Sequence, residues 1–446
     1  MSWLFSRRQS PPALRPARRP SALRLESLEG RDVPSTLSAI GSAVGGRVQV
    51  YDDQLGLVAD FQPFEGFLGS IRAATGDVNG DNFDDLVCVN GPGGPATVAV
   101  FLGTGGGSPA QFTGLNTTAA ARFLAFDQFA GGAFVAVGDV DPSNNTYDPA
   151  TSTFRRRAEI VVSTDVGAAE VRAFGNLATG NSTGVSFNPA APVANFTAYA
   201  GFAGGVTLSL GDVDADRFLD IVTGTATQAD HVKVFENLTQ TPAMLPAGGS
   251  VPFGGFNSGS LLASFLAYGG FPNGIYVSAA NLIQTSTTVG TTVSSVTTIT
   301  SPGADVIVGP AAGPAHLKVF ASQGTTTGGS VLGGTTYTGV STDPIASAIV
   351  DPSSAVGLPV AGLTPGGRYT STIDDGTTTT TTTTTSYGTV LTGTVTQGVP
   401  AVRGVTVDPV TGEVRPDLTG ALLPVEFGGV YPGQLEPGFG LPVMIA

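Results

Sequence analysis

Cysteine, histidine and long apolar runs are all scarce in this chain of 446 residues. The single cysteine, Cys88, excludes an intrachain disulfide framework and a zinc site built from several cysteines. Only two histidines, His231 and His316, are available to a mechanism that needs a histidine base or histidine ligands. Because apolar runs stay at a few residues, far below the roughly 20 that span a bilayer, we expect no transmembrane segment.

Charged residues are also scarce, and acidic residues outnumber basic ones. Only 12% of residues are charged, with 20 basic against 34 acidic side chains and a net charge of −14. Seven arginines lie within residues 1–31, so the remainder of the chain is more acidic than the total suggests. Nucleic-acid binding needs clustered Lys and Arg, and we therefore expect no nucleic-acid partner.

Glycine and proline are abundant. The chain has 63 Gly and 31 Pro, about a fifth of all residues, which excludes a mainly helical protein. A hydrophobic content of 41% excludes wholesale disorder. Together these features predict many short strands joined by turns.

Four aromatic triplets mark an internal repeat. Each has the pattern aromatic-x-x-aromatic-x-x-aromatic, and ten residues after its last member comes Asp77, Asp139, Asp212 or Asn281. The triplets are Phe61/Phe64/Phe67, Phe123/Phe126/Phe129, Phe196/Tyr199/Phe202 and Phe265/Tyr268/Phe271. Their regular spacing favours packing between repeats, and a sugar-binding surface is the alternative. The two histidines occupy equivalent places in successive repeats, which argues against a catalytic role.

Each repeat contains four predicted strands: one before an acidic loop, one after it, one ending in Val-x-Val-Phe or a close variant, and one ending in the aromatic triplet. This pattern predicts an all-β protein, a β-propeller of four-stranded blades. Four repeats are recognisable, plus a half at 48–61 that holds the last two strands of a blade. We favour five blades; seven blades or a partial ring remain open.

Composition divides the chain into four regions. Residues 1–36 are Arg- and Pro-rich, 37–321 hold the propeller repeats, and 322–385 form a Gly/Thr-rich low-complexity linker that ends in nine threonines. Residues 386–446 follow. Segments 388–397 and 403–408 alternate as strands do, so this last region is a candidate for supplying the missing half-blade and closing the propeller.

Two acidic loops carry the clearest chemical signal. The segments DVNGDNFDD (77–85) and DVDADRFLD (212–220) place oxygen side chains at positions one, three, five and nine, with a backbone carbonyl available at position seven. Hard cations such as Ca²⁺ prefer six to eight oxygen ligands, and close carboxylates repel one another without a cation. The candidate ligands are Asp77, Asn79, Asp81, Phe83 (carbonyl), Asp85, Asp212, Asp214, Asp216, Phe218 (carbonyl) and Asp220.

Two other structures could place acidic residues at this spacing. An EF-hand needs a glutamate at position twelve, where Cys88 and Thr223 stand, and helices on both sides, where the sequence predicts strands. Solvated turns are the other alternative, because Asp and Asn favour turns through hydrogen bonds to their own backbone.

Asp84, beside the ninth position of the first loop, is not among the candidate ligands. We expect its side chain to face solvent.

The other two repeats have altered loops. In the second, Asp139 and Asp141 remain, and an insertion separates them from Glu159 at the ninth place, which leaves a weaker candidate metal site. The insertion carries three consecutive arginines, 155–157, for which a solvated face is the simplest expectation. In the fourth, a Ser/Thr-rich insertion separates Asn281 from Asp305 and the middle ligands are missing, so we expect no ion there.

The Phe-rich strand, the Gly-Asp-Val-Asn-Gly-Asp-x-x-x-Asp loop and the Gly-Pro turn resemble FG-GAP repeats, which are also described as VCBS-type repeats and are similar to the integrin α-chain propeller. The resemblance covers about 48–320 and implies structural Ca²⁺ at the loop residues above. It departs from the family pattern at the sixth loop position, usually Gly and here Asn82 or Arg217, where a side chain implies a less favourable φ.

Residues 23–35, LRLESLEGRDVPS, resemble a short motif of the form LExLExRxxP that precedes large secreted or surface repeat proteins in bacteria. Together the resemblances imply an extracellular or cell-surface protein. The expected function is a non-catalytic, calcium-stabilised adhesion or interaction module with a protein or glycan partner. The alternative is a polysaccharide-active propeller, either a lectin or a lyase or hydrolase.

Overall fold

A computed structural model gives the fold of the chain. It describes residues 37–446 apart from 53–55, 107–110, 128, 149–152, 179–182, 240–250, 292–294, 301–302, 329–331, 352–359, 375–378, 397–398, 408–413, 417–422, 425–429 and 433–446. The predicted basic segment 1–36, with its motif at 23–35, lies outside the described residues.

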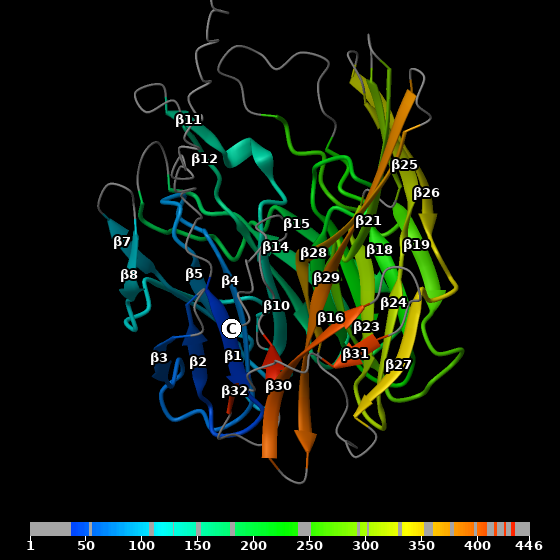
Figure 1. Cartoon of the computed structure of the whole chain (residues 1–446). Coiled ribbons are helices and arrows are strands. Elements are labelled where there is room, and N and C mark those ends of the chain that lie inside the picture. The colour runs from blue at the N-terminus through cyan, green and yellow to red at the C-terminus, as the bar shows by residue number, and fades with distance from the viewer. Residues whose placement is uncertain are drawn as a thin grey trace, which may run out of the picture. The chain divides into compact units, whose positions relative to one another are not determined.

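Five antiparallel sheets of four strands each form a five-bladed β-propeller (Figure 1). From blade 1 to blade 5 the first strand of each blade contacts the first strand of the next around the inside of the ring, and later strands lie progressively outward. This arrangement confirms the predicted all-β fold and the four-stranded blades, and it confirms five as the number of blades.

Each blade pairs its four strands in order from the inside outward. Blade 1 consists of β33 (Val430–Pro432), β1 (Ser38–Ser42), β2 (Val48–Tyr51) and β3 (Leu57–Phe61). Blade 2 consists of β4 (Ile71–Gly76), β5 (Asp85–Asn90), β6 (Thr97–Phe101) and β9 (Ala121–Leu124). Blade 3 consists of β10 (Ala133–Gly138), β13 (Glu159–Thr164), β14 (Ala169–Phe174) and β15 (Ala194–Tyr199).

The remaining blades follow the same plan. Blade 4 consists of β16 (Val206–Gly211), β17 (Asp220–Thr225), β18 (His231–Phe235) and β19 (Leu261–Leu266). Blade 5 consists of β20 (Ile275–Ala280), β23 (Asp305–Pro310), β24 (Ala315–Phe320) and β27 (Ala346–Asp351).

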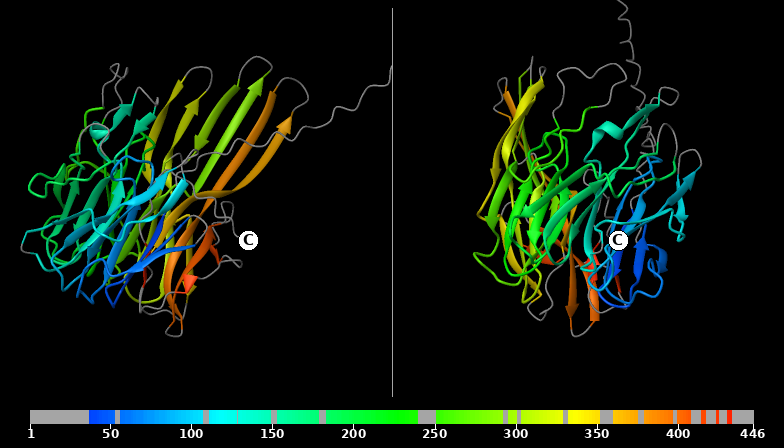
Figure 2. Two further views of the ribbon diagram at one scale, coloured as in Figure 1. Left: turned by 90° about the vertical axis from the view of Figure 1, so that its left-hand side faces the viewer. Right: turned by 180° about the vertical axis from the view of Figure 1, so that it is seen from behind.

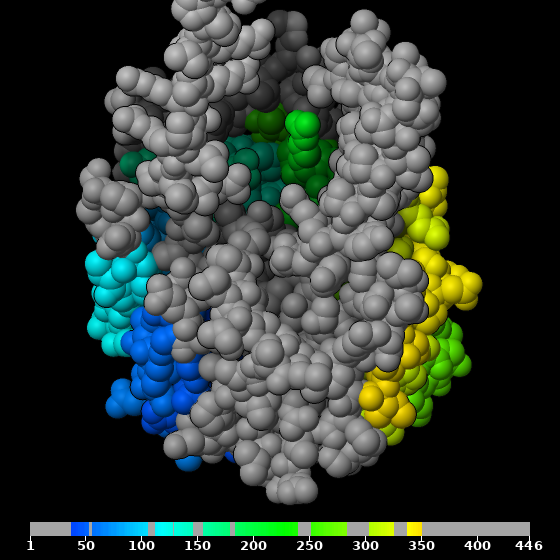
Figure 3. Space-filling model, viewed as in Figure 1, coloured from blue at the N-terminus to red at the C-terminus, as the bar shows by residue number. Residues whose placement is uncertain are grey.

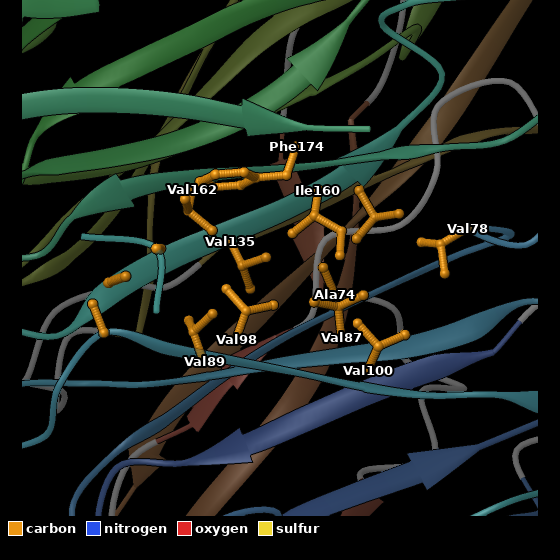
Figure 4. Close-up of a cluster of buried hydrophobic side chains, with 14 of the residues drawn as sticks. Ala74, Val78, Val87, Val89, Val98, Val100, Val135, Ile160, Val162 and Phe174 are labelled. Atoms are coloured by element: carbon orange, nitrogen blue, oxygen red, sulfur yellow. The ribbon is translucent and has the colours of Figure 1, made fainter. Parts of the chain in front are cut away.

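Burial differs between the inner and outer strands of a blade. Every residue of β4 and β5 is buried, whereas β19 exposes half of its residues, because inner strands are covered on both faces by neighbouring blades. Valines and alanines from blades 2 and 3, together with Ile160, interdigitate between the two sheets (Figure 4). Continuous burial explains why these strands read as apolar runs rather than as alternating patterns.

The aromatic triplets pack between blades, as predicted. The first aromatic of each triplet meets the final Phe of the third strand of the next blade, with ring centroids 4.8–5.0 Å apart. The pairs are Phe61–Phe101, Phe123–Phe174, Phe196–Phe235 and Phe265–Phe320. These ring contacts join blades 1 to 2, 2 to 3, 3 to 4 and 4 to 5.

Blade 1 combines both ends of the propeller region. The predicted strands at 48–61 are present as β2 and β3, but the expectation that two strands are missing is wrong, because β1 supplies one of them. The remaining strand is β33, which pairs antiparallel with β1 through Gly41 and Tyr431. The described parts of segments 388–397 and 403–408 fall in β29 and β30, which belong to another sheet.

That other sheet has nine strands and lies beside blade 5 (Figure 2). Its strand β28 contacts β20 and β23 of blade 5, and β29 contacts β33 of blade 1. Its members are β21 (Ile283–Thr291), β22 (Ser295–Thr300), β25 (Ser322–Gly328), β26 (Leu332–Val340), β28 (Val360–Asp374), β29 (Thr379–Thr396), β30 (Val399–Val407), β31 (Val414–Pro416) and β32 (Leu423–Pro424). Strands of this sheet therefore lie between blade 5 and blade 1.

Two small hairpins and one helical turn complete the described elements. The hairpins are β7 (Gly103–Gly106) with β8 (Gln111–Leu115) and β11 (Thr146–Asp148) with β12 (Thr153–Arg155). The turn is the 3-10 helix η1 (Pro142–Asn144), and no helix among the described residues has the length and apolar character to cross a membrane.

The space-filling view in Figure 3 shows the described surface of blade 1 (blue) and of blade 5 (yellow) on opposite sides of one face.

Candidate metal centres

Four loops link the first and second strands of blades 2 to 5. We call them the first loop (77–85), the second loop (139–159), the third loop (212–220) and the fourth loop (281–305). Because they join equivalent strands in successive blades, they lie at the same end of the propeller. The second loop contains η1 and the hairpin β11–β12, and the fourth contains β21 and β22.

The first loop folds around its own side-chain oxygens. Asp77 Oδ1 accepts hydrogen bonds from the backbone N–H of Gly80 (2.6 Å) and Asp81 (3.1 Å), and Asp77 Oδ2 accepts one from Asn82 (2.7 Å). Asn79 Oδ1 accepts from the Asp81 N–H at 2.9 Å. The side chains at positions one and three thus close one tight turn, and Asp81 Oδ2 at position five accepts from Asn79 Nδ2 at 3.0 Å.

The third loop repeats this geometry with a carboxylate at each of these positions. Asp212 Oδ1 accepts from the Asp216 N–H at 3.0 Å, and Asp214 Oδ1 accepts from the same N–H at 3.2 Å. Each of Asp212, Asp214 and Asp216 offers an oxygen within 4.8 Å of the others. The structure therefore brings together three of the predicted ligands in a cluster that could bind a metal ion.

Burial opposes ionisation of these carboxyl groups. Desolvation raises the pKa of Asp77 to about 7, of Asp212 to about 6 and of Asp216 to about 7, although backbone N–H groups partly offset the shift. Desolvation also raises the pKa of Asp81 and Asp214. In the third loop the neighbouring carboxylates add to the shift at Asp212 and Asp216, and a cation would reverse this penalty.

The acid at position nine has a different environment from the other three. Asp85 is fully buried; its Oδ2 accepts from the Val78 N–H at 3.0 Å and its Oδ1 from the Gly103 N–H at 2.9 Å. In the third loop Asp220 accepts from Val213 (2.9 Å) and Asn237 (3.0 Å) in the same way. Each carboxylate holds the start of its loop against the end of the third strand in its own blade. A lone pair on each oxygen remains for a cation.

The second loop is arranged differently around its three predicted ligands. Glu159 is fully buried and its Oε2 accepts from the N–H groups of Val140 and Asp141, at 2.9 and 2.8 Å. Asp141 Oδ1 caps η1 by accepting from the Ser143 N–H, and Asp139 Oδ2 accepts from the Asn145 side chain. The insertion therefore supplies neutral donors to these acids.

The fourth loop keeps only the ninth acid. Asp305 is fully buried, with Oδ2 accepting from the Leu282 N–H at 3.0 Å and Oδ1 from the Ser322 N–H at 3.1 Å. These partners are equivalent to those of Asp85 and Asp220. The ninth-position carboxylate thus has one role in the fold whether or not the other ligands are present.

The sixth loop position confirms the expected backbone strain. Asn82 has φ of 68° and Arg217 has φ of 83°, in the left-handed region that favours glycine. Arg217 N–H donates to Asp212 Oδ2 at 3.0 Å, so the turn itself requires this conformation.

Two expectations about neighbouring charges are wrong. Asp84 is buried, not solvent-facing, and its Oδ2 accepts from the Leu37 N–H at 2.9 Å, just before β1. Arg157 is also fully buried, and Arg155 is half-buried; only Arg156 is exposed. Buried carbonyl oxygens of the first loop accept from Arg155 and Arg157, which offsets the cost of removing these arginines from water.

Sequence reasoning also missed the residues that join each loop to the next blade. The Nδ2 atoms of Asn176 and Asn237 donate to the carbonyls of Val78 and Val140 at 2.9 Å, and Ser322 Oγ donates to Val213 O at 2.6 Å. Each donor stands two residues after the last Phe of a third strand. This constant distance in sequence from the third-strand Phe is the signal that could have identified these donors from the repeats.

The donor set suits a hard cation. All side-chain donors at positions one, three, five and nine of the first and third loops are carboxylate or amide oxygens, the ligands that Ca²⁺ takes at roughly 2.3–2.6 Å. Oxygens that share such an ion lie a few Å apart, which is compatible with the third-loop cluster. The carbonyl oxygens of Phe83 and Phe218 stay predicted ligands.

Comparison with known proteins gives little. No family model matches the chain, and no curated protein matches it. The solved structures similar to it include the exotype rhamnogalacturonan lyase YesX, at 9% identity and a TM-score of 0.33, covering 92% of this chain and 88% of that one. The V. cholerae biofilm matrix protein Bap1 is similar at 12% identity and a TM-score of 0.15, covering 90% and 70%. Neither similarity carries an argument about this chain.

Proposed function

We propose that this protein is a calcium-stabilised β-propeller in which the first and third loops each bind one Ca²⁺. The observation that carries the proposal is the convergence of Asp212, Asp214 and Asp216 within 4.8 Å in a loop that is closed by its own backbone. The first loop supports it with the same turn around Asp77. A cation would offset the desolvation of these carboxylates.

We further propose that the propeller acts outside the cell as a non-catalytic interaction module for a protein or glycan partner. The two histidines make equivalent contacts in successive blades, which supports a structural role for them. His231 hydrogen-bonds Ser264 and His316 hydrogen-bonds Ser347, each a serine of the fourth strand, both at 2.8 Å. Structural calcium sites fill readily where calcium is abundant, which favours an extracellular location.

Three measurements test the proposed function. Calcium titration calorimetry on the full chain should show binding that chelator abolishes. A glycan array with calcium, run beside a polysaccharide lyase and hydrolase assay, should show binding without turnover; turnover of any polysaccharide would contradict the non-catalytic assignment. Fractionation of the source cells should recover the protein at the surface or in the medium.

A further inference from the structure

The first loop is in contact with arginines from the neighbouring blade. The hairpin β11–β12 of the second loop places Arg155 Nη1 at 3.1 Å from Gly80 O, and Arg157 Nε at 3.4 Å from Asn79 O. The Ala158 N–H donates to Asp77 O at 2.8 Å. Three carbonyl groups of the first loop, those of residues 77, 79 and 80, are therefore bound from blade 3, and two of the three donors carry positive charge.

These charges act on the carboxylates of the first loop. The charge on Arg155 opposes the desolvation that raises the pKa of Asp81. Desolvation lowers the pKa of Arg157, and the nearby carboxylate of Asp77 opposes this shift by stabilising the charged guanidinium. A bound Ca²⁺ would face the same positive groups, and like charges repel.

The contacts described between the third loop and blade 5 come from neutral donors, and they match the Ala158 and Asn176 contacts of the first loop. The Ala304 N–H donates to Asp212 O at 2.7 Å, and Ser322 Oγ donates to Val213 O at 2.6 Å. The charges that act on Asp212 and Asp216 are those of neighbouring carboxylates. Position three adds to the contrast, because it is the neutral Asn79 in the first loop and the carboxylate Asp214 in the third.

We propose that the two loops bind Ca²⁺ with different affinities, the third more tightly, and that Arg155 sets the weaker affinity of the first loop from across the blade interface. The inference rests on the proposed calcium function. Its consequence is a propeller whose blade 4 stays loaded at calcium concentrations that empty the first loop. The interface between blades 2 and 3 then responds to calcium over a separate, higher range.

Single-site variants of the full chain test this inference by calcium titration calorimetry. Asp216→Asn leaves the first loop as the only intact site, and Asp81→Asn leaves the third. We expect affinity roughly ten-fold or more weaker in the first loop, because ligand charge tunes calcium affinity. Adding Arg155→Gln to Asp216→Asn should tighten binding about three- to ten-fold.

The control and the fold check use neighbouring positions. Arg156→Gln in the same background removes an adjacent, exposed arginine and should leave the first-loop affinity unchanged, whereas Arg155→Lys keeps the charge and should behave as Arg155 does. Arg155 is chosen over Arg157 because Arg157 is fully buried and its loss threatens folding. Thermal melting of each variant in chelator confirms that it is folded.

Equal affinities in the two single-site variants would overturn the inference. So would an Arg155→Gln effect no larger than that of Arg156→Gln. Absence of calcium binding to the unmodified chain is a separate result, which would overturn the proposed function and with it this inference.

Discussion

The first and third loops differ from the fourth in one instructive way. All three keep a buried carboxylate at position nine that accepts two backbone N–H groups from equivalent places, yet only the first and third keep oxygen side chains at positions one, three and five. The ninth carboxylate is therefore part of the blade fold. The fourth loop folds without the oxygen side chains at positions three and five, which supports the cation role proposed for them in the first and third loops.

The largest expected effect comes from removing the ninth carboxylate of the fourth loop, where we expect no cation site. Asp305→Ala leaves the Leu282 and Ser322 N–H groups buried without a partner, and we expect a loss of about 2–4 kcal/mol in the free energy of unfolding. Urea denaturation should show the same loss with and without calcium. Asp343→Ala, at an exposed position of the same blade region, is the matched control.

A loss that appears only in calcium would show that Asp305 is a metal ligand and would break the distinction between position nine and the other positions.

The next effect comes from removing a predicted ligand that has no counterpart in the fourth loop. Asp216→Ala should lower the free energy of unfolding by about 2–3 kcal/mol in excess calcium, because an ion at 100 times its dissociation constant contributes roughly 2.7 kcal/mol. In chelator the loss should be much smaller. Thermal melting in both conditions measures it, and equal losses in both would identify a plain turn.

The pH dependence of stability should differ with and without calcium. The raised pKa values of Asp77 (about 7), Asp212 (about 6) and Asp216 (about 7) mean that the calcium-free native state binds more protons than the unfolded chain between about pH 4 and 7. Without calcium the free energy of unfolding should therefore fall as pH rises across that window. With calcium the ion replaces the protons, and its stabilising effect should grow as pH rises.

Urea denaturation at a series of pH values in calcium-free and calcium-loaded buffer measures both curves. Parallel curves would contradict the assignment of these acids to a cation site.

The smallest effect concerns the sixth loop position. Arg217→Gly should stabilise the protein by about 0.5–1 kcal/mol, because glycine adopts the observed φ of 83° without a steric penalty. Asn82→Gly should give less, since asparagine tolerates the left-handed region better. Urea denaturation in saturating calcium checks the order, and a loss of stability in Arg217→Gly would indicate that the arginine side chain contributes to the loop.

Much of the fold could be predicted because the repeats carry their own signal. The aromatic triplets and the third-strand Phe residues gave the blades, and their contacts follow from the regular spacing. Strand β33 carried no such signal: it has three residues, and it pairs with a strand at the other end of the chain. Strand β1, SAIGS, is too short and too small-sided to show a pattern.

The candidate site likewise has features that the sequence could predict and features that it could not. Positions one, three and five follow from local turn chemistry, so the spacing of Asp212, Asp214 and Asp216 predicted their convergence. Burial of Asp84 and Arg157 depends on partners from other parts of the propeller, Leu37 and Asn79. A single sequence does not show such contacts, because they arise only when the blades assemble.

The number of calcium ions bound per chain tests the central claim most directly. Equilibrium dialysis against saturating calcium, with elemental analysis of both compartments, should find two bound ions in the unmodified protein, one in Asp216→Ala and two in Asp305→Ala. An unmodified protein without bound calcium, or an Asp216→Ala variant that keeps both ions, would contradict the account.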